Sequence, residues 1–169
     1  MTTTLHVRAA TPADTAAISA LNAQVFGPGR FVRTAYRVRA GLSLISPYCK
    51  VCVTETGALV AAVRLAPIRI GGMDRALMLG PLAVVPEYAG QGYGRQLIAE
   101  SLEHARRDGI RLVLLVGDEP YYGRLGFSLV PAGQITLPGP VDPARLLAAE
   151  LVPGALAEAH GLVSGDRQV

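Results

Sequence analysis

Apolar and polar residues in the first quarter of the chain follow two different spacings. The segment LHVRAA at 5–10 alternates as a β-strand does. Thr11 followed by Pro12 is a helix start signal, and the apolar residues after it keep helical spacing to about Phe26. After a Gly-Pro-Gly break, residues 31–40 predict a second, short helix.

The middle of the chain predicts a sheet that contains one parallel pair of strands. Strands are expected at 49–55 and 58–66, joined as a hairpin. An apolar strand at 75–85 precedes an amphipathic helix at 92–108, and a strand at 111–116 is apolar on both faces. The order strand–helix–strand implies parallel strands with a right-handed crossover. The fold class is therefore a mixed α/β sheet, mostly antiparallel and flanked by helices.

The C-terminal part gives weaker patterns. A short helix is expected at 120–125 and a strand at about 126–130. A stretch rich in proline and glycine follows, and residues 143–152 fit a strand or a helix equally.

Size and composition indicate one folded domain. A chain of 169 residues lies in the single-domain range, and we expect a core at 5–130 completed by 131–169. Hydrophobic residues make up 50% and charged residues 17%, which excludes a disordered chain. The longest apolar stretch, 76–85, is about half of a membrane span. The N-terminus lacks the basic and apolar regions of a signal peptide, so a cytoplasmic location is expected.

The net charge of +3 comes from fifteen arginines and one lysine spread along the chain. Without a basic stripe or a nucleic-acid reading motif, neither nucleic acid nor a membrane is an expected partner. Arg33 and Arg37 share a helix face, where they fit either an acidic acceptor or a solvated surface. Cys49 and Cys52 lie in a strand context that points them to opposite faces, which favours buried core cysteines over a redox or metal role.

The most informative stretch is LGPLAVVPEYAGQGYGRQLIAESL at 79–102. An apolar strand leads through a loop into a helix whose start carries Gly90, Gly92 and Gly94. Such glycines let backbone amides approach a ligand, and a helix N-terminus attracts anions, so phosphate or pyrophosphate fits better than a plain tight turn. Arg95 adds a positive charge. The spacing G-x-G-x-G is neither a dinucleotide-fold fingerprint nor a Walker loop.

These residues resemble the GNAT acetyltransferase superfamily, whose signature is [QR]-x-x-G-x-[GA] after an L-A-V-x-P strand end. Here the strand end is LAVVP at 82–86 and the loop is AGQGYG at 89–94, with Ala89 where the family usually has Arg or Gln. EPYYGRLGF at 119–127 is similar to the family's aromatic-Tyr-x-x-x-Gly-Phe element. Together with ELVPGAL at 150–156, it resembles the YhbS-type predicted acetyltransferases.

The resemblance implies transfer of an acetyl group from the cosubstrate acetyl-CoA to an amine of a small molecule or a peptide, with no metal. In this GNAT-like fold the two parallel strands, 75–85 and 111–116, would splay apart at their C-terminal ends. The pantetheine arm would lie between them and pair with the backbone of Leu82 and Val84, and the pyrophosphate would lie on the amides of 90–95. Ala89 would weaken the pyrophosphate contact. The residues that the resemblance assigns to the cosubstrate are Leu82, Ala83, Val84, Ala89, Gly90, Gln91, Gly92, Tyr93, Gly94 and Arg95.

The resemblance also implies catalytic roles. Tyr122 matches the general acid that protonates the leaving thiolate, with Tyr121 as a packing residue, and the amide of Val84 would polarise the acetyl carbonyl. The strand at 75–85 has no carboxylate for a general base, so Asp118 and Glu119 are candidates, and each could equally cap the next helix. His104 is expected on the exposed face of the helix at 92–108. The alternative function is a catalytically degenerate CoA or acyl-CoA sensor, and a homodimer is possible.

Overall fold

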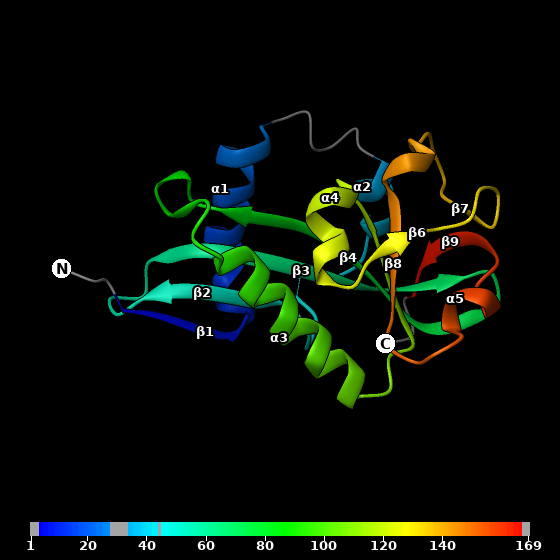
Figure 1. Cartoon of the computed structure of the whole chain (residues 1–169). Helices are drawn as coiled ribbons and strands as arrows, with labels where there is room; N and C mark the ends of the chain where they lie inside the picture. The colour runs from blue at the N-terminus through cyan, green and yellow to red at the C-terminus, as the bar shows by residue number, and fades with distance from the viewer. Residues whose placement is uncertain (1–3, 28–33, 44, 167–169) are drawn as a thin grey trace.

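The computed structural model describes residues 4–27, 34–43 and 45–166. The chain forms a mixed, mostly antiparallel sheet with helices on both faces (Figure 1). The strands run in the order β1-β2-β3-β4-β5-β8-β6, while β9 pairs with β3 and β7. The strands are β1 (Leu5–Ala9), β2 (Lys50–Thr54), β3 (Leu59–Ile70), β4 (Met73–Val84), β5 (Leu112–Val116), β6 (Ser128–Leu129), β7 (Ile135–Thr136), β8 (Leu146–Glu150) and β9 (Gly161–Gly165).

Two longer helices cover opposite faces of the sheet. The helices are α1 (Thr15–Phe26), α2 (Thr34–Arg39), α3 (Tyr93–Arg107), α4 (Glu119–Tyr122) and α5 (Ala155–Glu158). In Figure 1, α3 crosses the front of the strands and α1 lies behind them, in agreement with the contacts of α3 with β2 and β3 and of α1 with β4. The sequence therefore predicted the main helices and strands correctly, with boundaries that differ by a few residues.

The N-terminal helix begins as the sequence predicts. Thr11 precedes a single 3₁₀ turn at Pro12–Asp14, and α1 follows directly. The Thr11 amide donates to the Asp14 carboxylate at 2.8 Å, and Arg8 on β1 donates to both oxygens of that carboxylate at 2.8 Å. Asp14 thus ties the end of β1 to the start of the helix.

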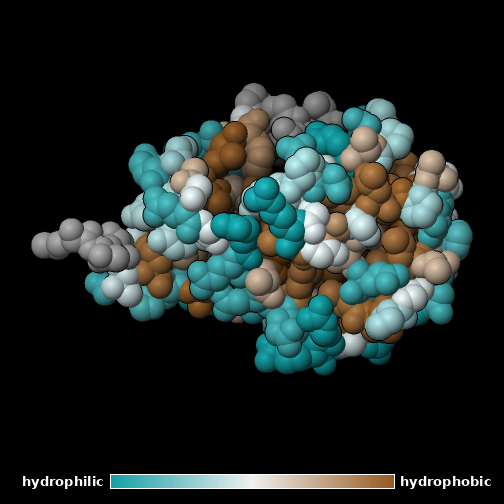
Figure 2. Space-filling model, viewed as in Figure 1, coloured by the Kyte–Doolittle hydropathy of each residue, from teal (hydrophilic) through white to brown (hydrophobic). Residues whose placement is uncertain are grey.

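Helix α3 owes its position to an apolar stripe on one side. Leu97, Ile98, Leu102 and Ala105 are buried against the sheet, as the spacing predicted. Figure 2 shows hydrophilic residues along its outer face. The helix ends at Asp108, and Gly109 follows in the left-handed region with φ 83°.

The cysteines occupy the two faces that the strand pattern predicted. Cys52 belongs to the core cluster beneath α3, whereas Cys49 packs with the cluster on the α1 side. Both cysteines are buried, and neither is part of a disulfide. This agrees with the interpretation of Cys49 and Cys52 as core residues.

The parallel pair of strands separates toward its C-terminal end. β4 pairs with β5 only from Ala76 to Met78. On its other side β4 stays paired with β3 as far as Val84, which lies opposite Ala61. The ladder between β3 and β4 is interrupted at Gly80, where φ is 123°, a backbone region that favours glycine. The half of β4 beyond Met78 therefore has one edge that β5 does not cover.

The C-terminal segment completes the sheet. Residues 143–152, which the sequence left open between strand and helix, contain β8, and β8 pairs along the whole outer edge of β5. Its first four side chains, residues 146–149, are all buried. The strand predicted near 126–130 is the short β6, which pairs with β8. In the described residues no helix is both long enough and apolar enough to cross a membrane.

Candidate active site

A cavity of about 310 Å³ lies at the N-terminal end of α3, between the end of β4 and α4. Its walls come from the strand end, the glycine loop, the first turn of α3 and the α4 region that follows β5. The lining residues are Val84, Tyr88, Ala89, Gly90, Gly92, Tyr93, Gly94, Arg95, Tyr121 and Arg124. Most of the residues that the sequence assigned to the cosubstrate are thus brought together around one cavity.

The glycine loop presents backbone amides to this cavity. Gly92 is the N-cap of α3 with φ 88°, and Gly90 has φ 75°. The first bond of the helix runs from the Gln96 amide to the Gly92 carbonyl at 3.0 Å. The amides of Tyr93, Gly94 and Arg95 therefore have no acceptor within the helix, and their partial positive charge favours an anion.

Gly94 lies where three elements meet. A Cβ at this position would be 3.2 Å from the Tyr121 hydroxyl, 3.3 Å from Leu82 Cδ2 and 3.6 Å from Val84 Cγ2. The absence of a side chain lets the first turn of α3 pack directly on β4 and α4. This contact places the helix N-terminus beside the open part of β4.

The backbone of β4 offers unpaired groups at that place. The Val85 amide donates to the Val60 carbonyl on β3 at 2.8 Å. Because successive residues of a strand point their N–H and C=O groups to alternate edges, Val84 and Leu82 direct theirs away from β3. β5 reaches only Met78, so within the described chain these groups have no neighbouring strand. Ala83 differs, since its N–H and C=O groups point toward β3, where it lies opposite Ala62.

The charge lining the cavity is positive. Arg95 and Arg124 both line it, and its described walls contain no carboxylate and no imidazole. Sequence reasoning selected Arg95 but missed Arg124 and Tyr88. The position of Arg124, three residues after Tyr121 in the turns that follow β5, was the available signal.

Ala89 and Gln91 lie in the loop with exposed side chains. Ala89 lines the cavity without offering a donor. The Gln91 side chain donates to the Glu87 carbonyl at 3.3 Å, which braces the loop.

The two tyrosines of α4 occupy different environments. Tyr121 lines the cavity, its hydroxyl is close to Gly94, and burial raises its pKa while Arg95 opposes that shift. Tyr122 packs against the core, edge-on to Phe127 with ring centroids 5.9 Å apart. Burial, followed by the charges of Tyr121 and Asp118, raises the pKa of Tyr122 to about 12. The sequence favoured Tyr122 as the acid and considered Tyr121 as a packing residue, and of the two Tyr121 is the one that lines the cavity.

The candidate bases are at the surface. The Asp118 carboxylate lies 3.5 Å from Arg145, and its side chain is 76% exposed. Its carbonyl accepts from the amides of Tyr121 and Tyr122, so the residue begins α4 through its backbone and its side chain forms no cap. Glu119 is also exposed, and neither carboxylate lines the cavity.

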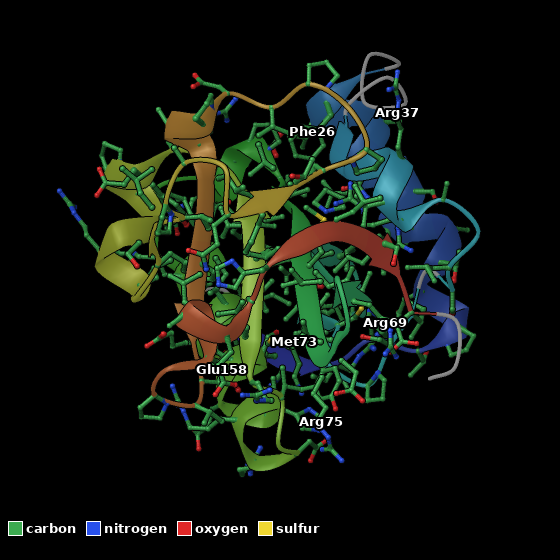
Figure 3. All side chains as sticks on the ribbon, turned by 90° about the vertical axis from the view of Figure 1, so that its right-hand side faces the viewer. Phe26, Arg37, Arg69, Met73, Arg75 and Glu158 are labelled. Carbon is green, nitrogen blue, oxygen red and sulfur yellow. The ribbon has the colours of Figure 1, made fainter. Side chains whose placement is uncertain are left out.

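The arginines considered for the acceptor are only partly described. Arg33 lies outside the described residues. Arg37 is exposed on α2, and Figure 3 shows it at the outer side of that helix. Its position fits the solvated surface that was one of the two interpretations.

The fold and the cavity define a class of protein. The chain belongs to the GNAT acetyltransferases, because the model of that acetyltransferase domain matches residues 6–130. Among curated relatives, the uncharacterized N-acetyltransferase YhbS of Escherichia coli K12 is 31% identical over 114 residues, which are 67% of this chain and 68% of that protein. YjhQ of the same strain, also an uncharacterized N-acetyltransferase, is 48% identical over 60 residues, or 34% of this chain and 33% of that protein.

Solved structures of relatives contain the expected cosubstrate. The crystal structure of Escherichia coli YhbS in complex with CoA has a TM-score of 0.82 at 26% identity, over 98% of this chain and 92% of that one. A GNAT acetyltransferase of Brucella melitensis in complex with acetyl-CoA has a TM-score of 0.64 at 29% identity, over 88% and 97% of the two chains. The resemblance inferred from the glycine loop is confirmed.

Proposed function

We propose that this chain binds acetyl-CoA and transfers its acetyl group to a primary amine by direct attack. The observation that carries the proposal is the continuity between the positive cavity at the start of α3 and the open edge of β4, which meet at Gly94. Pyrophosphate matches the amides and arginines of the cavity, and the amides of pantetheine match a strand edge. The CoA complexes of the two relatives support this assignment.

In the proposed reaction a neutral amine attacks the thioester carbonyl. The N–C bond forms and the C–S bond breaks, with the backbone amide of Val84 as the donor to the oxyanion. Tyr122 is the proposed acid for the leaving thiolate. A phenol with a pKa of about 12 keeps its proton at neutral pH, so it has one to give.

A second candidate function is binding without turnover. The lack of a carboxylate or imidazole in the described cavity walls favours it, as does Ala89 in place of a charged or amide side chain. A chain of this kind would act as a CoA or acyl-CoA sensor. Turnover separates the two functions, whereas binding alone does not.

The first experiment measures thermal unfolding with saturating acetyl-CoA. At about a hundred times the dissociation constant the ligand adds roughly 2.7 kcal/mol to the free energy of unfolding. For this chain length the melting temperature should rise by about 5–10 °C. ATP and NAD at the same concentration should leave it unchanged. The absence of a shift with acetyl-CoA would remove the binding proposal.

The second experiment measures release of the CoA thiol against a panel of primary amines. Tyr122→Phe should keep the thermal shift and lose about 10²-fold or more in kcat, since it removes the acid. Tyr121→Phe is the matched control and should keep most of kcat. If Tyr121→Phe loses turnover and Tyr122→Phe does not, Tyr121 is the acid instead of Tyr122. Binding without turnover on any amine would favour the sensor.

A further inference from the structure

The single lysine of the chain lies away from the cavity, under the C-terminal end of α3. Lys50 begins β2, on the same face of the sheet as Cys52, and this face packs against the helix. The other fifteen long cations are arginines, whose guanidinium is not deprotonated in proteins. Lys50 is therefore the only side-chain amine that can act as a nucleophile.

His104 contacts this amine, and Asp108 and Tyr48 contact His104. Lys50 Nζ lies 3.2 Å from His104 Nδ1, and His104 Nε2 lies 3.5 Å from Asp108 Oδ2. The Tyr48 ring packs edge-on against the imidazole, with centroids 5.0 Å apart, and its hydroxyl bonds to Asp108. The sequence expected His104 on the exposed helix face, which is wrong, because its side chain is only 26% exposed and faces β2.

The arrangement fixes one tautomer of His104. A lysine ammonium only donates, so Nδ1 must accept and the ring proton must lie on Nε2, toward the carboxylate of Asp108. In this arrangement the basic nitrogen of a neutral imidazole faces an amine, and its other nitrogen faces a carboxylate. The same arrangement activates nucleophiles in hydrolases and transferases.

We propose that Lys50 is an acylation site of this chain, with His104 as its general base and Asp108 as the residue that positions the imidazole. The acyl donor is an acyl thioester in solution, such as acetyl-CoA. Lys50 first loses its ammonium proton to solvent. Its Nζ then attacks the thioester carbonyl as the neutral amine, the N–C bond forms, and the C–S bond breaks. His104 Nδ1 takes the proton from the nitrogen, and the proton finally neutralises the thiolate. The product is an amide that has lost the positive charge of Lys50.

The acylation does not use the cavity. His104 follows Tyr93 by eleven residues on α3, which places it about 16 Å farther along the helix. The anion cavity at the start of α3 is therefore separate from this amine, and the inference does not rest on the proposed function. The two amines of the chain, Lys50 and the N-terminus, can be followed separately by mass spectrometry.

The test compares Lys50 with a second lysine in the same molecule. Arg107→Lys introduces an exposed lysine on α3, and this second lysine serves as an internal reference. The chain is treated with acetyl-CoA and, separately, with N-hydroxysuccinimide acetate, and acetylation of each lysine is followed over time. We expect Lys50 to react at least about tenfold faster than the reference. An equal or slower rate overturns the proposal.

Variants in this background assign the roles. His104→Gln should lower the ratio of the two rates by about tenfold or more, whereas Glu103→Gln, one residue earlier and exposed, should leave it unchanged. Asp108→Asn should lower the ratio less, and Asp108→Glu should restore it. Tyr122→Phe should not change it. A faster Lys50 in His104→Gln would show that the imidazole only holds the ammonium, and the proposal would fail.

Discussion

Gly94 is the residue at which binding and stability can be separated. Gly94→Ala would place a methyl group against the Tyr121 hydroxyl at 3.2 Å and Leu82 Cδ2 at 3.3 Å, so these side chains must shift into or around the cavity. Alanine in place of glycine favours a helix by about 0.5–1 kcal/mol. We expect an unchanged or higher melting temperature without ligand and an affinity for acetyl-CoA about tenfold lower, measured by calorimetry.

The matched control is Gly72→Ala, because Gly72 lies in the β3–β4 turn with open space around its Cβ position. This variant should bind acetyl-CoA as the parent chain does. Equal affinities for the two variants would show that the first turn of α3 does not contact the ligand.

At the same scale, the sequence predicted which residues line the cavity better than it predicted which side chains these residues pack against. The glycines and Arg95 follow from local backbone requirements, which a motif records directly. Arg124, the division between Tyr121 and Tyr122, and the partners of His104 depend on which element packs beside which. A single-sequence pattern contains the periodicity of α3 but not the identity of β2 beneath it.

At the scale of elements, the link between β1 and α1 depends on one carboxylate. Hydrogen bonds from the Arg8 guanidinium to the Asp14 carboxylate hold the pKa of Asp14 well below its usual range. The hydrogen bond from the Thr11 amide lowers this pKa further. Asp14→Asn should lower the free energy of unfolding by about 1 kcal/mol at neutral pH. Asp74→Asn, at an exposed carboxylate, is the control and should change it little.

The pH dependence of this difference follows from the direction of the shift. A lowered pKa in the folded state gives a contribution that is complete above the unfolded value of about 4 and is lost as the pH falls below it. Urea unfolding at about pH 7, 5 and 3 should therefore show the same difference at the first two values and a smaller one at the third. A difference that grows in acid would exclude the Arg8–Asp14 pair as its source.

The elements themselves were predicted where their pattern was long or carried a turn signal. The hairpin of β2 and β3 and the crossover through α3 were found because their periodicity extends over many residues. β8 was not, since five residues of LLAAE fit a buried strand and a short helix equally. This segment is a strand because it pairs with the free edge of β5, and nothing in its own sequence indicates that pairing.

At the scale of the whole molecule, the edge of β4 beyond Met78 stays open only if β5, the neighbouring strand, does not pair with it there. β5 can leave β4 beyond Met78 because β8 pairs with all five of its residues and satisfies its other edge. The C-terminal segment is thus part of the architecture that creates the site, although the matched GNAT domain ends at residue 130. The homodimer and the cytoplasmic location stay predictions from the sequence.

Leu147 tests whether the C-terminal segment and the rest of the sheet form one cooperative unit. Its side chain is fully buried and β8 pairs it with Leu115 of β5, so Leu147→Ala should lower the free energy of unfolding by about 2–5 kcal/mol. Leu129→Ala on β6, at a side chain 50% exposed, is the control and should cost much less. In urea the Leu147 variant should show a lower midpoint with an unchanged m-value, because all strands unfold together. A smaller m-value with a nearly normal midpoint would mean that β8 detaches separately, and the open edge of β4 would then have to be maintained without it.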